Sequence, residues 1–138
     1  FLLGKAQVLM PGADVTIFAC GHLVWQALLA HNALAEQGIA AAVVNVHTIK
    51  PLDEATIVEW ARRTGAVVTA EEHMRHGGLG DSVAQVLARH APTPQEYVAV
   101  NDSFGESGTP DKLLEKYGLN SAAIVAAAHA ALARKAGV

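Results

Sequence analysis

Apolar residues in this chain gather into four short runs that are nearly continuous rather than alternating with polar residues. The runs cover positions 15–20, 41–47, 66–71 and 97–100. Runs of this length and pattern are typical of strands that are covered on both faces. The pattern therefore predicts a sheet buried between two layers of helices.

Segments with helical spacing follow these runs. Helices are expected at about 21–37, 53–64, 78–90 and 110–118, and a last one begins at a cap formed by Asn120. Asp53 is a candidate N-cap, while Gly38 and Gly65 stand where a helix C-terminus favours glycine. This succession of strands and helices predicts a doubly wound α/β fold with right-handed crossovers.

A shorter apolar run at 6–10 precedes these elements and is followed by Pro11 and Gly12, a pair that favours a turn. Taken locally, the turn predicts an antiparallel hairpin between 6–10 and 15–20. The first strand would then lie beside the second in the sheet.

The composition fits a single domain that spans residues 1–138. With 51% hydrophobic and 17% charged residues, the chain has enough apolar side chains for a core and is too apolar to be disordered. The net charge of −3 argues against nucleic acid or an anionic membrane as the main partner. No apolar run approaches the roughly 20 residues that span a bilayer.

Cysteine usage and the first residue bear on the origin of the chain. The single Cys20 cannot form an internal disulfide and fits a reducing compartment, so we expect a cytoplasmic protein. Because the chain opens on Phe1 and shows no signal peptide, we expect it to be a piece excised from a longer polypeptide.

Two loops that follow predicted strands carry candidate chemistry, "CGHL" at 20–23 and "EEHMRHGGLG" at 71–80. Loops at the carboxyl ends of strands are where open α/β sheets place their ligands, above all where the strand order reverses. Gly77, Gly78 and Gly80 directly precede a helix, so their N–H groups could bind a phosphate or a carboxylate. The alternative is that these glycines only permit a tight turn and close packing. Their spacing is neither that of a dinucleotide fingerprint nor that of a P-loop.

The histidines and acids of the second loop allow two further interpretations. His73 and His76 beside Glu71 and Glu72 are possible metal ligands, but a metal site needs three or four ligands that converge, and we expect none here. Glu72 and His73 could act as an acid–base pair, although no nucleophile accompanies them. Helical His31, His90 and His129 are expected at or near the surface. The residues of the possible ligand or anion site are therefore Gly21, His22, Glu72, His73, Gly77, Gly78 and Gly80.

Three segments together carry a family resemblance: "VHTIKPLD" at 46–53, "TAEEHMRHGGLGDSVAQVL" at 69–87 and "DSFGESGTPDKLLEKYGL" at 102–119. In order and spacing they resemble the C-terminal domain of transketolase, especially the split, two-subunit form, within the superfamily of thiamine-diphosphate-dependent enzymes. The resemblance covers nearly the whole chain. Deoxyxylulose phosphate synthase and the beta subunits of 2-oxo acid dehydrogenases carry the same domain, but "FGESG" looks more like transketolase.

The resemblance implies a three-layer αβα fold with a mixed five-stranded sheet in the order 1-3-2-4-5, strand 1 being antiparallel to the rest. The run at 6–10 would then lie at the sheet edge beside the third strand, in conflict with the local hairpin, and we follow the family. Strands 2 and 4 become neighbours, so the loops at 20–23 and 71–80 would line a common crevice. For the polar loop at 102–110 we expect helix capping and contact with another domain.

The resemblance also implies an activity for the parent protein, which is the transfer of a two-carbon ketol unit between phosphosugars, as in the pentose phosphate pathway. Thiamine diphosphate and a divalent cation, Mg²⁺ or Ca²⁺, would lie between an N-terminal and a middle, pyrimidine-binding domain of a homodimeric or heterotetrameric enzyme. This chain lacks the Gly-Asp-Gly motif with its late Asn and the activating glutamate. We therefore assign it no catalytic, cofactor-binding or metal-binding residue, and expect the isolated domain to be inactive.

Two other functions stay open from the sequence. The domain could be a regulatory module that binds an anion or small ligand at the glycine-rich loop. It could also be the partner-docking domain of a 2-oxo acid dehydrogenase beta subunit.

Overall fold

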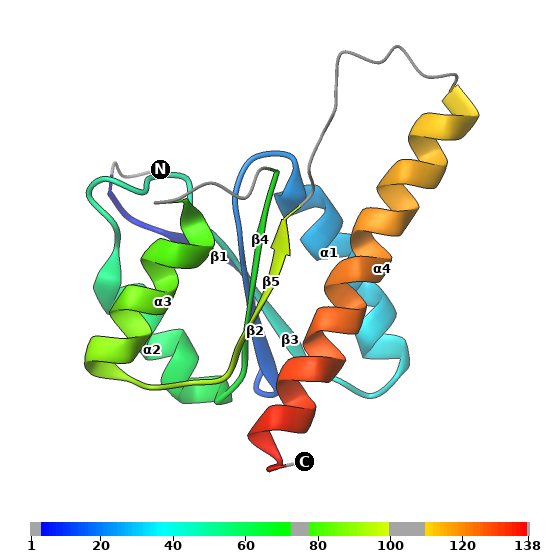
Figure 1. The fold of residues 1–138 in the computed structure, drawn as a ribbon. Coiled ribbons are helices and arrows are strands. Elements are labelled where there is room, and N and C mark those ends of the chain that lie inside the picture. The colour runs from blue at the N-terminus through cyan, green and yellow to red at the C-terminus, as the bar shows by residue number, and fades with distance from the viewer. Residues whose placement is uncertain (1–3, 73–77, 100–109, 138) are drawn as a thin grey trace.

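The computed structural model describes residues 4–72, 78–99 and 110–137, and in 110–119 it describes the backbone alone (Figure 1). Five strands and four helices follow one another along these residues. They are β1 (Gln7–Met10), β2 (Val15–Ala19), α1 (Leu23–Glu36), β3 (Ala41–Asn45), α2 (Glu54–Thr64), β4 (Val67–Glu71), α3 (Leu79–His90), β5 (Gln95–Ala99) and α4 (Pro110–Lys135).

The strands form one sheet in the order β1-β3-β2-β4-β5. Strands β3, β2, β4 and β5 are parallel, and β1 is antiparallel to β3. The fold and strand order implied by the resemblance are confirmed. The local prediction of a hairpin between β1 and β2 is wrong, because both edges of β2 are occupied by β3 and β4.

The turn at Pro11 and Gly12 crosses the beginning of β3 instead of folding back on β2. A Cβ atom on Gly12 would lie 2.4 Å from the backbone of Ala41, so only glycine permits this close approach. Asp14 then fixes the crossing, since its N–H donates to the Ala40 carbonyl at 2.9 Å and its carboxylate accepts the Ala40 N–H at 2.7 Å.

Helices α1 and α4 cover one face of the sheet, and α2 and α3 cover the other (Figure 1). Neighbouring residues of one strand serve both layers: Ile17 packs under α1 and α4, and Phe18 packs under α2 and α3. Side chains alternate between the two faces of a strand, so both faces of β2 must be apolar. This explains why the strand sequences are continuous apolar runs.

Helix α2 begins and ends as its sequence predicts. The Asp53 carboxylate accepts the Thr56 N–H at 3.2 Å, and Gly65 follows the helix with a φ of 73°. Asp53 also accepts the Ala6 N–H at 2.8 Å and therefore connects α2 to the segment before β1. Burial alone would raise the pKa of Asp53, but the hydrogen bonds from Thr56 and Ala6, with the charge of Lys5, lower it below its ordinary value.

The C-terminal segment differs from its prediction. Two helices separated near Gly118 and Asn120 were expected, but α4 runs without a break from Pro110 to Lys135. A glycine inside a helix costs only about 1 kcal/mol relative to alanine. The buried side chains of Ile124, Ala128 and Ala131 fix the second half of α4 on the sheet, and a helix that is already formed extends readily.

Smaller differences occur at strand ends. β2 ends at Ala19, so Cys20 is half-buried in the following turn rather than within the strand. β5 begins at Gln95, two residues before the expected position, because its pairing with β4 begins there. Among the residues that the structure describes, no helix is long and apolar enough to cross a membrane.

Candidate functional site

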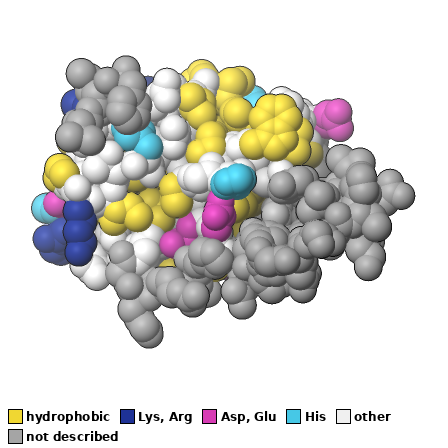
Figure 2. Space-filling model, turned by 90° about the horizontal axis from the view of Figure 1, so that it is seen from above, with side chains coloured by type: hydrophobic (Ala, Val, Ile, Leu, Met, Phe, Trp, Pro, Cys, Tyr) yellow, Lys and Arg dark blue, Asp and Glu magenta, His cyan; other side chains and the backbone are white. Residues whose placement is uncertain are grey.

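The predicted site lies where the strand order reverses. The chain leaves β2 toward α1 on one face, and it leaves the neighbouring β4 toward α3 on the other. Figure 2 looks onto this end of the molecule, where acidic side chains and a histidine lie among hydrophobic ones. The arrangement is the switch point at which α/β proteins commonly bind ligands.

Gly21 and His22, which follow β2, contact Glu72, which follows β4. The Glu72 carboxylate accepts the His22 N–H at 3.0 Å, and the His22 Nε2 atom lies 3.7 Å from the same oxygen. Gly21 has a φ of 61°, and a Cβ atom there would lie 3.2 Å from Glu72 Oε1. The structure therefore brings these three predicted residues together. The His22 side chain itself is 80% exposed.

The glycine-rich helix start is already bound by a carboxylate of the chain. Glu71 is buried and accepts the N–H groups of Leu79 at 3.1 Å and of Gly80 at 2.7 Å. A negative charge at this position is favourable because the helix dipole places partial positive charge at the N-terminus of α3. From the sequence, Glu71 was considered only as a metal ligand. Its capping role links residues eight and nine positions apart, which no local capping pattern contains.

The described glycines of this loop have structural roles. A Cβ atom on Gly80 would lie 2.5 Å from the ring of Tyr97, so glycine lets α3 pack closely on β5. Gly78 is the N-cap of α3 in an extended conformation. An external anion would have to displace Glu71 from these N–H groups. The anion site stays a prediction, and two of its residues, His73 and Gly77, lie outside the described part of the chain.

Cys20 is a poor nucleophile. Burial, together with the charges of Glu71 and then Glu72, raises the pKa of its thiol to about 11. The thiol is therefore protonated at neutral pH, and the thiolate is the reactive form.

Three histidines expected at or near the surface are found there, each with a partner. His31 Nδ1 lies 2.7 Å from the Ala41 carbonyl, and His129 Nε2 lies 2.7 Å from Gln37 Oε1. His90 ends α3 and lies 3.6 Å from Glu54. These contacts indicate structural roles on the helices.

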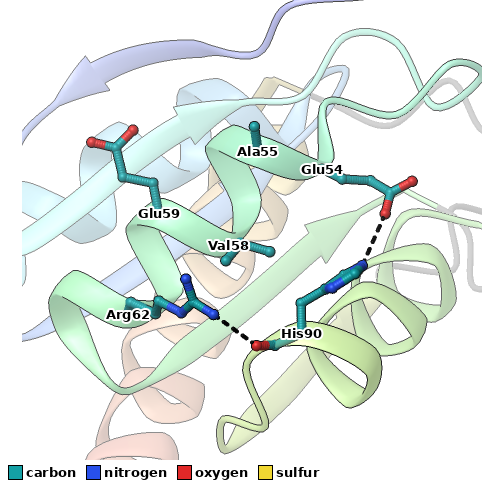
Figure 3. Close-up of a pocket in the computed structure, with 6 residues that line it drawn as sticks. All are labelled: Glu54, Ala55, Val58, Glu59, Arg62 and His90. Carbon is teal, nitrogen blue, oxygen red and sulfur yellow. Dashed lines mark hydrogen bonds and ion pairs between the residues drawn. The ribbon is translucent and has the colours of Figure 1, made fainter.

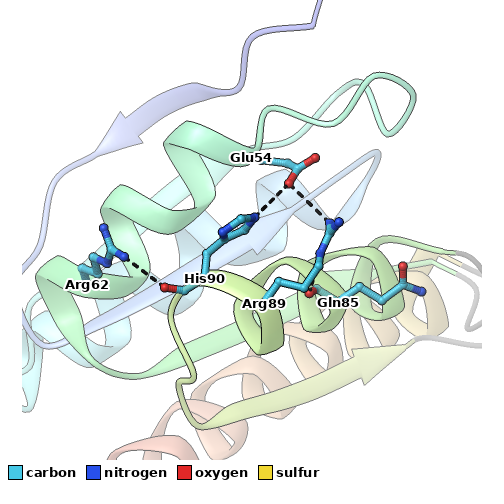
Figure 4. A network of polar contacts seen from close by, with 5 residues as sticks. All are labelled: Glu54, Arg62, Gln85, Arg89 and His90. Carbon is cyan, nitrogen blue, oxygen red and sulfur yellow. Dashed lines mark hydrogen bonds and ion pairs between the residues drawn. The ribbon is translucent and has the colours of Figure 1, made fainter.

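A groove between α2 and α3 was not foreseen. It has a volume of about 610 Å³ and is lined by Glu54, Ala55, Val58, Glu59, Arg62 and His90 (Figure 3). Arg89 and His90 both reach the Glu54 carboxylate, at 3.3 and 3.6 Å, and Arg62 donates to the His90 carbonyl at 3.0 Å (Figure 4). Its walls come from helices separated in sequence by β4, so no sequence motif could reveal it. Arg89 and His90 share the Glu54 carboxylate, whereas Arg62 binds a backbone carbonyl, and these contacts form no reactive arrangement.

The described residues do not fit thiamine diphosphate and its cation. None of them form a group of three or more His, Cys, Asp or Glu side chains that could hold one metal ion. The N-terminus of α3 is bound by Glu71, whose negative charge would repel a diphosphate. We therefore derive no chemical step through the cofactor in this domain.

Comparison with known families agrees with the fold. Residues 4–124 match the family described as the C-terminal domain of transketolase. The chain belongs to this family, and the resemblance seen in the sequence is confirmed.

Individual relatives are similar over almost the whole chain. It is 52% identical over 135 residues to the 6-deoxy-6-sulfo-D-fructose transketolase subunit SqwH of Clostridium sp. (strain MSTE9), covering 98% of this chain and 42% of that protein. It is 40% identical over 136 residues to the 1-deoxy-D-xylulose-5-phosphate synthase of Desulforudis audaxviator (strain MP104C), covering 97% of this chain and 22% of that one.

Solved structures show the same fold. A split gene transketolase, solved as an inactive beta4 tetramer, matches with a TM-score of 0.86 and 52% identity over 98% of this chain and 44% of that chain. A transketolase of Pichia stipitis matches with a TM-score of 0.65 at 20% identity, which shows the fold alone. The chain spans less than half the length of each of these relatives.

Proposed function

We propose that this chain is the C-terminal domain of one subunit of a split transketolase, whose subunits together transfer a two-carbon ketol unit with thiamine diphosphate. The observation that carries the proposal is the 52% identity to a transketolase subunit over 98% of the chain, within a family match at 4–124. The chain covers 42% of that subunit, so a subunit of that length would carry a further domain, and the partner subunit would supply the rest of the enzyme.

The domain itself supports the enzyme and performs no chemistry. Glu71 and Glu72 bind backbone N–H groups, and the Cys20 thiol is protonated at neutral pH. The cofactor and its cation belong to the N-terminal and middle domains of the assembled enzyme, as the family resemblance implies.

The ketose donor carries a terminal anionic group, either a phosphate or a sulfonate. The relative that is 52% identical is a transketolase of 6-deoxy-6-sulfo-D-fructose, and a relative in Phocaeicola vulgatus that is 39% identical belongs to an apulose-4-phosphate transketolase. The higher identity to the 6-deoxy-6-sulfo-D-fructose enzyme favours a donor with a sulfonate group, and the assay below distinguishes the two kinds of donor.

The test uses the full-length subunit that contains this chain, mixed with its partner subunit, thiamine diphosphate and Mg²⁺. Fructose 6-phosphate, xylulose 5-phosphate and 6-deoxy-6-sulfofructose are offered as donors with an aldose phosphate acceptor, and products are followed by mass spectrometry. We expect ketol transfer only when both subunits are present. Absence of transfer from every donor overturns the proposal, and so does condensation of pyruvate with release of CO₂, which would indicate a synthase.

The 138-residue chain is assayed separately under the same conditions. We expect no turnover from it. Turnover by this chain alone would contradict its assignment as a supporting domain.

A further inference from the structure

Helix α1 lacks the charged outer side that surface helices normally have. No Lys, Arg, Asp or Glu occurs from Leu23 to Ala35, whereas the shorter α2 contains Glu54, Glu59, Arg62 and Arg63. Apart from Gln26, His31 and Asn32, its residues up to Ala35 are apolar. A predominantly apolar helix is typical of one that is covered on most of its sides. The composition of α1 therefore predicts cover on both its inner and its outer side.

The domain covers α1 on its inner side only. Leu23, Ala27 and Leu34 are buried against the sheet. On the outer side, Trp25 is 63% exposed and is the most exposed large hydrophobic side chain of the described residues. Leu29, one turn further, is half-buried and does not belong to either core cluster. Trp25 and Leu29 thus form an apolar stripe that faces solvent in this chain.

Helix α4 extends the same surface. It packs beside α1 on one face of the sheet (Figure 1), and it carries no charged residue from Asn120 to Ala133. Its exposed positions there are mostly small and apolar: Ala122, Ala123, Ala126, Ala130 and Ala133. The first charged residues, Arg134 and Lys135, bind Glu96 and the Thr64 carbonyl at the far end of the helix.

The outer surface of α1 up to Ala35 and the 120–133 part of α4 shares two features with an interface core, the absence of charged residues and an exposed tryptophan. Such cores are depleted in charged residues, and tryptophan is enriched among the residues that dominate binding energy. Large apolar surfaces that are rimmed by polar residues commonly mark interaction sites. We infer that this surface, centred on Trp25, is buried against another domain of the same subunit.

The choice of occupant rests on the proposed function and on the length of the relatives. If the chain is part of such a subunit, more than half of the polypeptide lies outside it, since it covers 42% of the relative that is 52% identical. A domain of the same polypeptide is held near the surface at an effective concentration that reaches about the millimolar range, which is enough for a weak contact to form. A second copy of the chain has to bind from dilute solution, so the tethered domain occupies the surface first.

The experiment is hydroxyl-radical footprinting of the full-length subunit and of the 138-residue chain, with oxidation quantified residue by residue. Trp60, which is 8% exposed, is the reference for a protected indole, and exposed Tyr97 is the control outside the surface. We expect Trp25 to be oxidised readily in the 138-residue chain and as slowly as Trp60 in the full subunit. Tyr97 should react equally in both.

Two outcomes overturn the inference. Oxidation of Trp25 at the same rate in the full subunit would show that the surface stays exposed. Protection that disappears when the full subunit is diluted to a monomer would show that a second copy covers it. Neither result depends on ketol transfer, so failure of the inference and failure of the proposed function are distinguishable.

A matched pair of variants tests the same surface without oxidation. Trp25→Glu and Ala55→Glu each add one negative charge to an exposed helical position, on opposite faces of the sheet. In the full subunit, we expect Trp25→Glu to separate the unfolding of this domain from that of the rest in calorimetry, whereas Ala55→Glu leaves one transition. Equal behaviour of the two variants contradicts the inference.

Discussion

The two helix layers of this domain cover the same sheet but differ on their outer sides. In the α2/α3 layer, Trp60 is buried and the guanidinium of Arg63 lies over its ring at 4.7 Å, with further charges around the groove. In the α1/α4 layer, Trp25 is exposed on a helix without charge until Glu36. The comparison teaches that two layers can cover one sheet equally well and still have outer surfaces of opposite character. The α2/α3 layer has the sequence of a solvent-facing surface, whereas α1 up to Ala35 and the 120–133 part of α4 do not.

The inner sides of the two layers should contribute similar amounts to the free energy of unfolding. Substitutions there should have the largest effects and give the strongest test of the comparison. Phe18→Ala, under α2 and α3, should lower the free energy of unfolding by about 3–5 kcal/mol, and Ile17→Ala, under α1 and α4, by about 2–5 kcal/mol. Urea denaturation of the 138-residue chain measures both. A loss below about 1 kcal/mol for Ile17→Ala would mean that the α1/α4 core is not consolidated without its outer partner.

The close fit of α3 on β5 should be visible at Gly80. The added methyl of Gly80→Ala meets the Tyr97 ring, so we expect a loss of about 1–3 kcal/mol in unfolding free energy. Combining it with Tyr97→Ala should give a smaller loss than the sum of the two single changes, because the clash is removed. Simple additivity in thermal or urea unfolding would argue against this contact.

The N-cap of α2 should contribute stability that depends on pH. Asp53→Ala should cost about 0.5–2 kcal/mol at neutral pH. Because the folded-state pKa of Asp53 is lowered from its ordinary value of 3.8, its contribution is present above that value and is lost as pH falls through the lower folded value. Urea unfolding of the wild type and the variant should therefore converge in strong acid. A difference that stays constant with pH would contradict an ionised cap.

The smallest effect is expected at the ion pairs of the groove. Glu54→Gln removes the partner of Arg89 and His90, and exposed pairs of this kind contribute about 0–1 kcal/mol. The effect should shrink further at high salt, where exposed charges are screened. Glu36→Gln, which removes the same charge at the end of α1, is the control in thermal unfolding. A salt-independent loss at Glu54 would show that this network is more than a solvated surface.

The sequence predicted most of the elements because their signals are local. The apolar runs marked four strands. Asp53 marked the start of α2, where it caps the helix. Gly38 and Gly65 marked the ends of α1 and α2, and both have the left-handed backbone conformation. Strand order could not be obtained in this way, because the local turn at Pro11 favoured a hairpin that the structure lacks. Order came from the family resemblance.

The meeting of the two loops followed from the strand order that the family resemblance implied, whereas the anion site expected there stays a prediction. The loops after β2 and β4 were expected to meet, and His22 does contact Glu72. The capping of α3 by Glu71 was missed because it depends on the direction of one side chain at a strand end. The groove at Glu54 and His90 was missed because it joins two separate helices.

The adjacent acids Glu71 and Glu72 have a consequence for how the chain tolerates insertions. One carboxylate holds the start of α3 and the next holds the turn before α1, two helices on opposite faces of the sheet. Which glutamate points to which helix depends on the register in which β4 ends, because successive side chains of a strand point to opposite faces of the sheet. Adding or deleting a single residue in β4 would turn each of the two carboxylates to the opposite face of the sheet, and a helix start would then lose its carboxylate. Natural length variation in this family should therefore accumulate after Glu72 rather than before Glu71.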